Sequence, residues 1–405
     1  GIQNTLIGGL AGDAITTGGE NTTVGYASSG ATTTGIRNAV LGNNALLTNT
    51  TGGANTAIGY SALYSNTTAS NNTAVGFHAL VTNTTGASNT AVGKNVLFSN
   101  TTGGFNVGLG SDAFYGNTTG ASNVAVGDNA LQGNTTASNN TAVGRQALAL
   151  NTTGIYNVAL GRSALSANTT ASYNVAIGGD ALPANTTGAN NTAVGTNALL
   201  ATTTGAQNTA VGKDAGTVTT TGSGNTCLGH GINTASAVSN YNLVAGYNSS
   251  AASAGNGWAT FGYNNTRTYI SLGNTSWSGT SDSRLKENVA DHTLGLGFIN
   301  ALRPVTYNWK KKKDVPSELS DYYKEGSNDR VNGTDGLRHG FIAQEVKTVM
   351  DSNSLASDSF NLWNTMGDGT QALADGELIP VLTKAIQELS TQLDAALARI
   401  TTLEG

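Results

Sequence analysis

A serine and a lysine lie five residues apart in the segment 281–288, which reads Ser-Asp-Ser-Arg-Leu-Lys-Glu-Asn. A serine hydroxyl is a poor nucleophile until a base removes its proton, and a lysine can be that base when burial lowers its pKa. On an α-helix, side chains five residues apart point about 140° away from each other. Ser281 and Lys286 could therefore meet only in a turn, in an extended segment or across two subunits. By itself such a pair does not indicate catalysis.

Upstream of this pair, a glycine recurs every 17 residues from Gly8 to Gly246. The middle repeats read Asn-Thr-Ala-Val-Gly, two variable residues, Ala-Leu, two more variable residues, and Asn-Thr-Thr followed by Gly or Ala. A period this strict predicts a solenoid in which each repeat forms one coil. With coils about 4.8 Å apart, the shaft would be on the order of 70 Å long.

Each coil is expected to contain a short β-strand that ends at its glycine. Along one such strand, Thr56 and Ile58 point to one side, whereas Ala57 and the glycine point to the other. We expect the β-branched face to pack into a core and the Ala/Gly face to let another backbone come close. Leu63 and its equivalents add a second apolar position. Asn-Thr-Thr-Gly supplies the turn, because Asn and Gly tolerate the backbone angles of a sharp corner.

Charge divides the chain into two parts. Residues 1–280 carry 12 of the 43 charged residues, and residues 281–405 carry the other 31. The formal net charge of −5 offers no basic surface for nucleic acid. The single cysteine, Cys227, replaces the alanine of its repeat, which excludes an intrachain disulfide framework and favours a buried small side chain. We find no membrane-spanning apolar stretch and no signal peptide, and we expect no cofactor and no metal.

Two segments depart from the repeat. Residues 247–280 lose the period and gain aromatic residues, which we interpret as a cap on the open end of the solenoid; stacking platforms for glycans are the alternative. Residues 378–405 carry apolar residues at alternating spacings of three and four, which is typical of a coiled coil, although an amphipathic helix on the chain's own core is the alternative. These apolar residues are Ile379, Leu382, Ile386, Leu389, Leu393, Ala396, Ile400 and Leu403.

Two further motifs follow the first. They are Leu-Arg-Pro-Val-Thr-Tyr-Asn-Trp at residues 302–309 and His-Gly-Phe-Ile-Ala-Gln-Glu-Val at residues 339–346. In this order the three motifs resemble the C-terminal intramolecular chaperone of phage endosialidases, tail spikes and tail fibres. The resemblance implies a domain that trimerises, guides the folding of the fibre before it, and then cuts itself off just ahead of the first motif.

The same resemblance assigns roles to residues of the first motif. It implies that Ser281 is the nucleophile, that Lys286 is its activating base, and that the bond between Thr280 and Ser281 is cleaved. Asp282 would hold the lysine or position the chain. Attack by Ser281 on the carbonyl of Thr280 would give an acyl intermediate that water resolves. We expect one turnover on the protein's own chain and no activity on external substrates.

The repeat part is similar to the parallel β-roll heads of trimeric autotransporter adhesins and to the repeat shafts of phage tail fibres. This resemblance implies a homotrimer. The predicted fold is therefore mainly β: a trimeric parallel β-roll or solenoid over residues 1–246, a capping or neck segment over 247–280, and a small α+β chaperone domain over 281–405 that ends in a coiled-coil helix.

The predicted function is that of a phage tail fibre or tail spike segment. Its partners would be a bacterial surface glycan or protein receptor and other tail proteins, with no membrane insertion. It would reside in the virion, and the chaperone domain would be made in the host cytoplasm and released. The two variable residues after each glycine form a candidate binding stripe, for which plain solvent exposure is the simpler explanation.

Other functions remain open at this point. A trimeric bacterial surface adhesin would need a C-terminal membrane anchor, whereas this chain ends in a heptad helix. An ice-binding solenoid would carry alternate threonines on one strand, whereas Thr67-Thr68 and their copies are expected in turns; thermal hysteresis of the shaft would decide. A glycan-degrading enzyme is also conceivable, but paired carboxylates are hard to find in a shaft with so few acidic residues.

Overall fold

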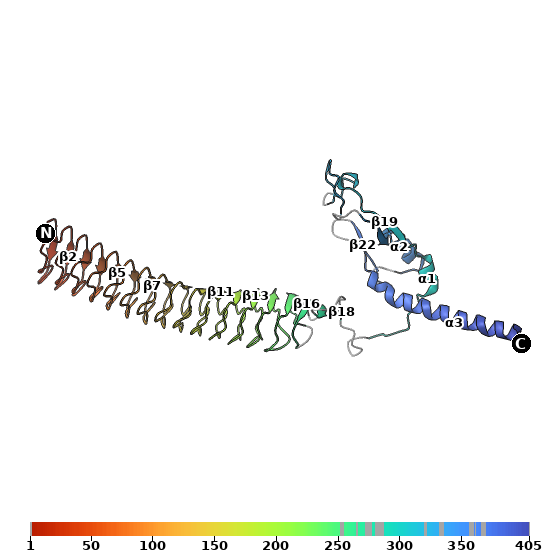
Figure 1. Cartoon of the computed structure of the whole chain (residues 1–405), viewed down its shortest axis with the longest axis horizontal. Coiled ribbons are helices and arrows are strands. Elements are labelled where there is room, and N and C mark those ends of the chain that lie inside the picture. Colours follow the sequence, from red (N-terminus) through yellow and green to blue (C-terminus); the bar gives the residue numbers. More distant parts are fainter. Residues whose placement is uncertain are drawn as a thin grey trace. The chain divides into compact units, whose positions relative to one another are not determined.

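The computed structural model describes residues 2–251, 255–264, 266–271, 278–279, 287–319, 322–331, 336–355, 360, 362–365 and 370–404. The chain divides into two compact units, Gly1–Ser281 and Asp282–Gly405 (Figure 1). The first unit is a long β-solenoid, and the second is a small α+β domain with a long C-terminal helix. The predicted fold class is confirmed on these points.

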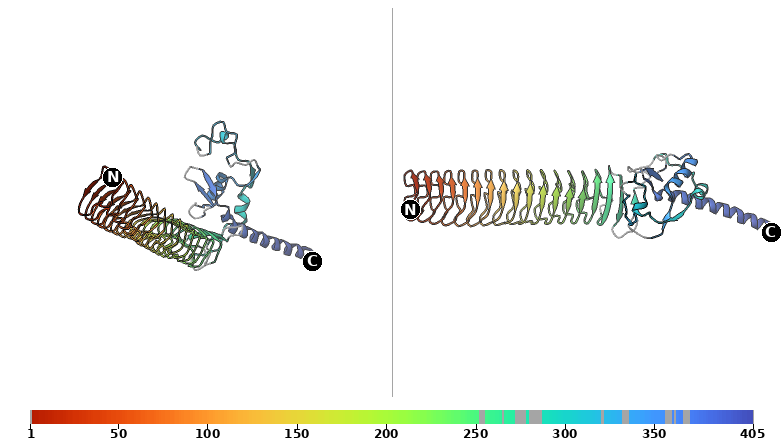
Figure 2. Two further views of the ribbon diagram at one scale, coloured as in Figure 1. Left: turned by 60° about the vertical axis from the view of Figure 1, so that its left-hand side comes forward. Right: turned by 90° about the horizontal axis from the view of Figure 1, so that it is seen from above.

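The shaft contains one short strand per coil, and Figure 2 shows these strands side by side in a row. Neighbouring strands are parallel, and each residue pairs with the residue 17 positions later, as in Thr56↔Thr73. The strands are β1 (Thr5–Ile7), β2 (Thr22–Val24), β3 (Ala39–Leu41), β4 (Thr56–Ile58), β5 (Thr73–Val75), β6 (Thr90–Val92), β7 (Val107–Leu109), β8 (Val124–Val126), β9 (Thr141–Val143), β10 (Val158–Leu160), β11 (Val175–Ile177), β12 (Thr192–Val194), β13 (Thr209–Val211), β14 (Thr226–Leu228) and β15 (Leu243–Tyr247).

Parallel stacking continues one strand beyond the 17-residue period. Strand β16 (Trp258–Tyr263) pairs in parallel with β15, with Leu243 opposite Ala259. Strands β17 (Thr266–Ser271) and β18 (Ser278–Gly279) then add on in antiparallel orientation. The direction of the chain therefore reverses at the end of the shaft, where the sequence analysis expected a cap.

The two faces of each strand are the reverse of our expectation. Ala57 is 0% exposed and belongs to the continuous core of the shaft, whereas Ile58 points outward and is 38% exposed. The interior of a 17-residue coil is narrow, and leucine and asparagine side chains occupy much of it, so the inward-facing strand position is an alanine in most coils. The close approach at the glycine is found as expected, because a Cβ on Gly59 would lie 2.3 Å from the carbonyl oxygen of Gly76.

In most coils a leucine stands four residues after the glycine, and it lies inside the shaft, as predicted. Leu63, Leu80 and their equivalents are buried, yet their φ angles are positive, near 50–56°. This left-handed conformation costs a branched residue roughly 1–2 kcal/mol. Burial of a leucine side chain contributes about 1.5–3 kcal/mol, which offsets that cost.

Two ladders of buried asparagines run along the shaft, and we did not predict them. The first ladder uses the asparagine four residues before each glycine, where Asn38 donates through Nδ2 to Asn21 Oδ1 over 3.1 Å and to the carbonyl of Gly52 over 3.0 Å. The second uses the asparagine of Asn-Thr-Thr, where Asn66 Nδ2 donates to Asn49 Oδ1 over 2.9 Å. These turn asparagines are therefore required for their amides and not for positive φ angles, which fall elsewhere in the coil.

Replacing a ladder asparagine is expected to destabilise the shaft. Asn106 donates to Asn89 Oδ1 and to the carbonyl of Gly120, and its own Oδ1 accepts from the backbone and side chain of Asn123. Asn106→Ala leaves several of these buried groups without a hydrogen-bond partner, which should lower the free energy of unfolding by roughly 3 kcal/mol. Calorimetry should show a lower unfolding temperature for this variant. The control Gln132→Ala removes an exposed amide and should leave the unfolding temperature unchanged. Equal midpoints for both variants would contradict the ladder's contribution.

Cys227 lies in the alanine column of the shaft, opposite Ala210 and Val244, as its place in the repeat predicted. Its burial raises the pKa of the thiol from 9.0 to about 12. The protonated thiol is thus favoured by the fold. Its contribution to stability is full below pH 9 and is lost as the pH rises toward 12.

The buried thiol should resist thiol–disulfide exchange in the folded chain. At pH 8 the reaction of Cys227 with a disulfide reagent is expected to be at least about 100-fold slower in the native protein than in denaturant, because the nucleophile is the thiolate. Timed absorbance of the released thiol measures both rates. Comparable rates in the two conditions would mean that this coil opens readily.

Among its described residues, the C-terminal unit has three α-helices, two short 3-10 helices and two two-stranded antiparallel sheets. Its elements are α1 (Leu296–Ala301), β19 (Val305–Tyr307), η2 (Lys312–Asp314), β20 (Arg338–Gly340), α2 (Ala343–Ser352), β21 (Trp363–Thr365), β22 (Gln371–Leu373), η3 (Asp375–Glu377) and α3 (Leu378–Glu404). Its core contains Phe298, Val346, Met350, Leu362 and Val381. Among the helices of the described residues, none combines the length and apolar character needed to cross a membrane.

Candidate functional site

The predicted self-cleavage site lies outside the residues that the structure describes. This applies to Thr280, Ser281, Asp282 and Lys286. We therefore describe the elements that precede and follow these residues in the chain.

The backbone before the predicted bond is held by the end of the shaft. Strand β18 ends at Gly279, which pairs with Thr268 of β17. The peptide bond after Thr280 thus follows directly on the last strand of the first unit and lies within one residue of the division between the units. A cut there would separate two units that each have a core of their own.

The second and third sequence motifs each contribute a strand to one two-stranded antiparallel sheet. Strand β19 comes from the second motif and pairs antiparallel with β20, so that Val305 lies opposite Gly340 and Thr306 opposite His339. His339 is exposed on this sheet. The fold thus brings together two segments that stand about 30 residues apart in the sequence.

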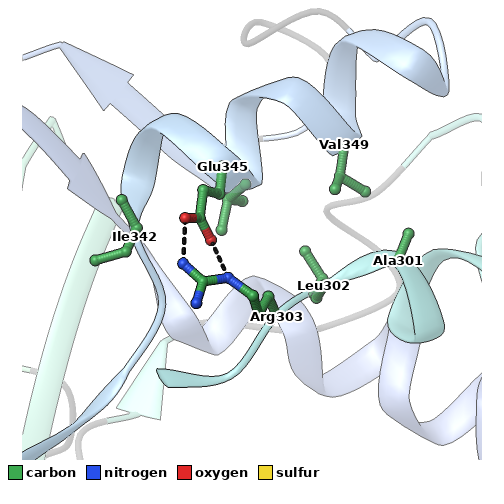
Figure 3. A pocket seen from close by; sticks show the side chains of 7 residues that line it. Ala301, Leu302, Arg303, Ile342, Glu345 and Val349 are labelled. Atoms are coloured by element: carbon green, nitrogen blue, oxygen red, sulfur yellow. Dashed lines mark hydrogen bonds and ion pairs between the residues drawn. The ribbon is translucent and has the colours of Figure 1, made fainter. Parts of the chain in front are cut away.

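A charged pair joins the same two motifs a few residues away (Figure 3). Arg303 donates through Nε to Glu345 Oε2 over 2.9 Å and through Nη2 to Oε1 of the same carboxylate. This pairing raises the pKa of Arg303 and lowers the pKa of Glu345. The two-pronged geometry fixes the direction of both side chains. The pair joins α2 to the short segment between α1 and β19.

This pair forms part of the wall of a small cavity of about 240 Å³. The remaining wall consists of the apolar residues Ala301, Leu302, Ile342, Val346 and Val349. Neither Arg303 nor Glu345 was predicted from the sequence to be a site residue. The available signal was the presence of opposite charges in two motifs that were already expected to belong to one domain.

Comparison with known proteins agrees with the geometry. Residues 281–355 match the family model described as chaperone of endosialidase. Over these residues the C-terminal unit is similar to that family, and we refer to this unit below as the chaperone domain. The match begins at Ser281, directly after the last strand of the shaft, and includes the β19–β20 sheet and the Arg303–Glu345 pair of this chaperone domain. The family is one of self-cleaving chaperones, which supports autoproteolysis in general. No curated protein and no solved structure matches the chain.

The chaperone domain also holds the first half of α3. Leu378, Val381 and Ala385 of this helix are buried against the domain, and Glu388 Oε2 accepts a hydrogen bond of 2.8 Å from the backbone N–H of Leu296 in α1. The same helix therefore has a second, outward face that the domain does not cover.

The candidate binding stripe on the shaft is exposed at its first position. Tyr60, Phe77 and Lys94, each directly after a glycine, are open to solvent, whereas the second residue is mostly half-buried and has a positive φ angle, as at His78 and Asn95. The first position can therefore vary freely without disturbing the coil.

Proposed function

We propose that this chain is part of a phage tail fibre or tail spike that attaches to the host surface as a homotrimer. Its C-terminal chaperone domain drives trimeric folding and then releases itself by cleavage between Thr280 and Ser281. The single observation that carries the proposal is the order of the two units, in which a chaperone-of-endosialidase match begins where a long β-solenoid ends. In the virion the shaft would contact other tail proteins and a glycan or protein receptor.

The cleavage would use Ser281 and Lys286. The amine of Lys286 takes the proton from Ser281 Oγ, which attacks the carbonyl carbon of Thr280. The bond from this carbon to the backbone nitrogen of Ser281 breaks, and the nitrogen receives the proton from the lysine. Water then hydrolyses the resulting ester, which gives a carboxylate on Thr280 and restores the serine hydroxyl. Asp282 would orient the lysine.

The outward face of the shaft sheet supports association with further copies. Each strand presents two side chains outward, and the second is usually Val, Ile or Leu. Ile58, Val92 and Ile177 are 37–38% exposed, so an apolar row follows the whole shaft. A continuous apolar surface of this length is typical of an interface. Second and third copies of the same shaft would cover it.

Helix α3 supports the same assembly. Ile386 and Leu389 belong to its heptad pattern and are 67% and 54% exposed, whereas the residues that pack on the chaperone domain lie on another face. In coiled coils, heptad residues of this kind are buried between two or more helices. Two further α3 helices would bury it in a coiled coil.

Intact mass and light scattering of the freshly expressed chain test the proposal. We expect two fragments, residues 1–280 and 281–405, and a shaft with three times the mass of its fragment. An intact chain would contradict the proposed self-cleavage, and a monomeric shaft would contradict the proposed homotrimer. Attachment is tested separately by binding of the labelled shaft to a panel of bacterial strains.

The exposed seam of α3 gives a specific prediction. In an uncleaved Ser281→Ala background, the double variant Ile386→Lys and Leu389→Lys is expected to lose the trimer, because charges would face one another in the seam. The matched control is Gln387→Lys, an exposed position outside the seam. Light scattering should give a trimer for the control alone. A trimer in the double variant would show that the apolar row of the shaft suffices and would contradict the need for α3 in assembly.

Ice binding gains support from one observation. Thr56, Thr73 and Thr90 lie on strands and stack outward in register, whereas Thr67-Thr68 and their copies lie outside the strands, as expected. Valine interrupts this column at 107, 124, 158 and 175, and the neighbouring column is aliphatic. We therefore rank ice binding below attachment. Thermal hysteresis of the purified shaft would separate the two.

A further inference from the structure

Five aromatic rings gather on four successive coils of the shaft. Tyr60 stacks on Phe77 with ring centroids 5.6 Å apart, and Phe77 stacks on His78 at 3.9 Å. His78 lies 6.0 Å from Phe98, which stacks on Tyr115 at 5.0 Å. We call this cluster the aromatic platform. It is half open to solvent, with Tyr60 49% and Phe77 47% exposed.

The coil does not need these rings in order to fold. In coils outside the platform the residue directly after the glycine is Asp128, Arg145 or Arg162, and their strands pair in the same register. Phe98 and Tyr115 likewise occupy the repeat position that Gln132 holds in the coil after that of Tyr115. Because the repeat tolerates polar residues at every platform position, folding alone does not explain why the rings are concentrated between residues 60 and 115.

Polar groups lie in the same turns as the platform. Asn95 Nδ2 donates to Asp112 Oδ1 over 2.9 Å, and Ser111 Oγ donates to Asp112 Oδ2 over 2.8 Å. Lys94 is exposed between the coils of Phe77 and Ser111. Amide, hydroxyl and carboxylate groups in fixed positions thus flank an apolar aromatic surface, and the opposite charges of Lys94 and Asp112 balance.

We propose that the aromatic platform binds a neutral polysaccharide of a bacterial surface; this inference rests on the proposed attachment function and names its ligand class. A pyranose ring presents an apolar face of C–H groups and a rim of hydroxyls, which suits aromatic side chains with a few placed polar partners. Coils repeat at about 4.8 Å, so a saccharide chain that follows the shaft would meet a new ring or polar group at each coil.

The test uses the labelled full-length chain on an array of purified bacterial O-antigen and capsular polysaccharides. The double variant Tyr60→Ala and Phe77→Ala should weaken the apparent Kd for the bound polysaccharide at least about tenfold, as expected for loss of central aromatic contacts. The matched control is Tyr156→Ala with Tyr173→Ala. These two rings stack at 5.3 Å on another part of the shaft and are equally exposed, at 49% and 54%. The control should bind like the parent.

Several results would overturn the proposal. They are a parent that binds no polysaccharide, a platform variant that binds as well as the parent, an equal loss in the control, or a changed oligomeric mass of the platform variant, which would make the platform an interface between subunits. Binding to bacterial strains before and after periodate oxidation separates the two levels of inference. If the parent still binds strains after periodate oxidation, the attachment function is supported and the saccharide-binding role of the platform is contradicted. If the parent binds no strain, both proposals are contradicted.

Discussion

Chains that carry Ser281→Ala or Lys286→Ala are expected to stay whole at the Thr280–Ser281 bond, whereas the parent chain separates into two fragments. The serine variant lacks the attacking oxygen, and the lysine variant lacks the base that activates it. The change in the cleaved fraction should approach the full range from complete to none. Denaturing electrophoresis with intact mass of freshly expressed protein measures it and locates the new terminus.

Two nearby substitutions serve as controls for this result. Ser283→Ala and Arg284→Ala alter the same segment with the same type of side-chain loss, and both chains should be cleaved like the parent. Cleavage that persists in Ser281→Ala would exclude this serine as the nucleophile. Loss of cleavage in all four variants would mean that the segment must merely keep its local structure, and the assignment of the two catalytic roles would fall.

Gly178→Ala is expected to lower the stability of the shaft by roughly 2–6 kcal/mol, whereas the adjacent Gly179→Ala should have almost no effect. Gly178 has a φ angle of +131°, and a Cβ there would lie 2.6 Å from the carbonyl carbon of Gly195. Both the backbone strain and the overlap, each roughly 1–3 kcal/mol, oppose the alanine. A Cβ on Gly179 would meet nothing within 4 Å.

Scanning calorimetry of both variants measures this difference. The pair is informative because the two glycines are neighbours and the chemical change is the same. The transition of Gly178→Ala should move to a lower temperature, and protease cleavage should begin in the coils around it. Similar transitions for the two variants would show that the glycine column is not under the steric constraint that the geometry indicates.

Much of the shaft could be predicted from the repeat alone. The 17-residue period gave the coil length, the parallel register and the need for glycine at the close approach, because a constraint that recurs in every coil leaves a periodic trace. The direction of the strand faces could not be derived in this way. Alternation separates Ala57 from Ile58 but does not say which faces inward, and that depends on how much volume the leucines and asparagines already occupy.

The asparagines were read as turn formers, and their larger role was missed. Sequence-local reasoning assigns Asn66 to a corner, whereas its amide bonds with Asn49 depend on the stacking of coils, which is a non-local property. In the chaperone domain, the order of the motifs predicted one domain, and the fold adds the contact between Arg303 and Glu345. The roles of Ser281 and Lys286 remain predictions from the resemblance, since they lie outside the described residues.

The uniform register of the shaft has a consequence for how such a protein can change. Within the 17-residue repeat, the strand and the buried asparagines of one coil contact the same positions of the next coil. A deletion or duplication of 17 residues therefore leaves each junction identical to the one it replaces. Exchange between near-identical repeats of a gene would lengthen or shorten the rod by steps of about 4.8 Å without a new fold having to be found. Reach is thus a property that this architecture can adjust one coil at a time.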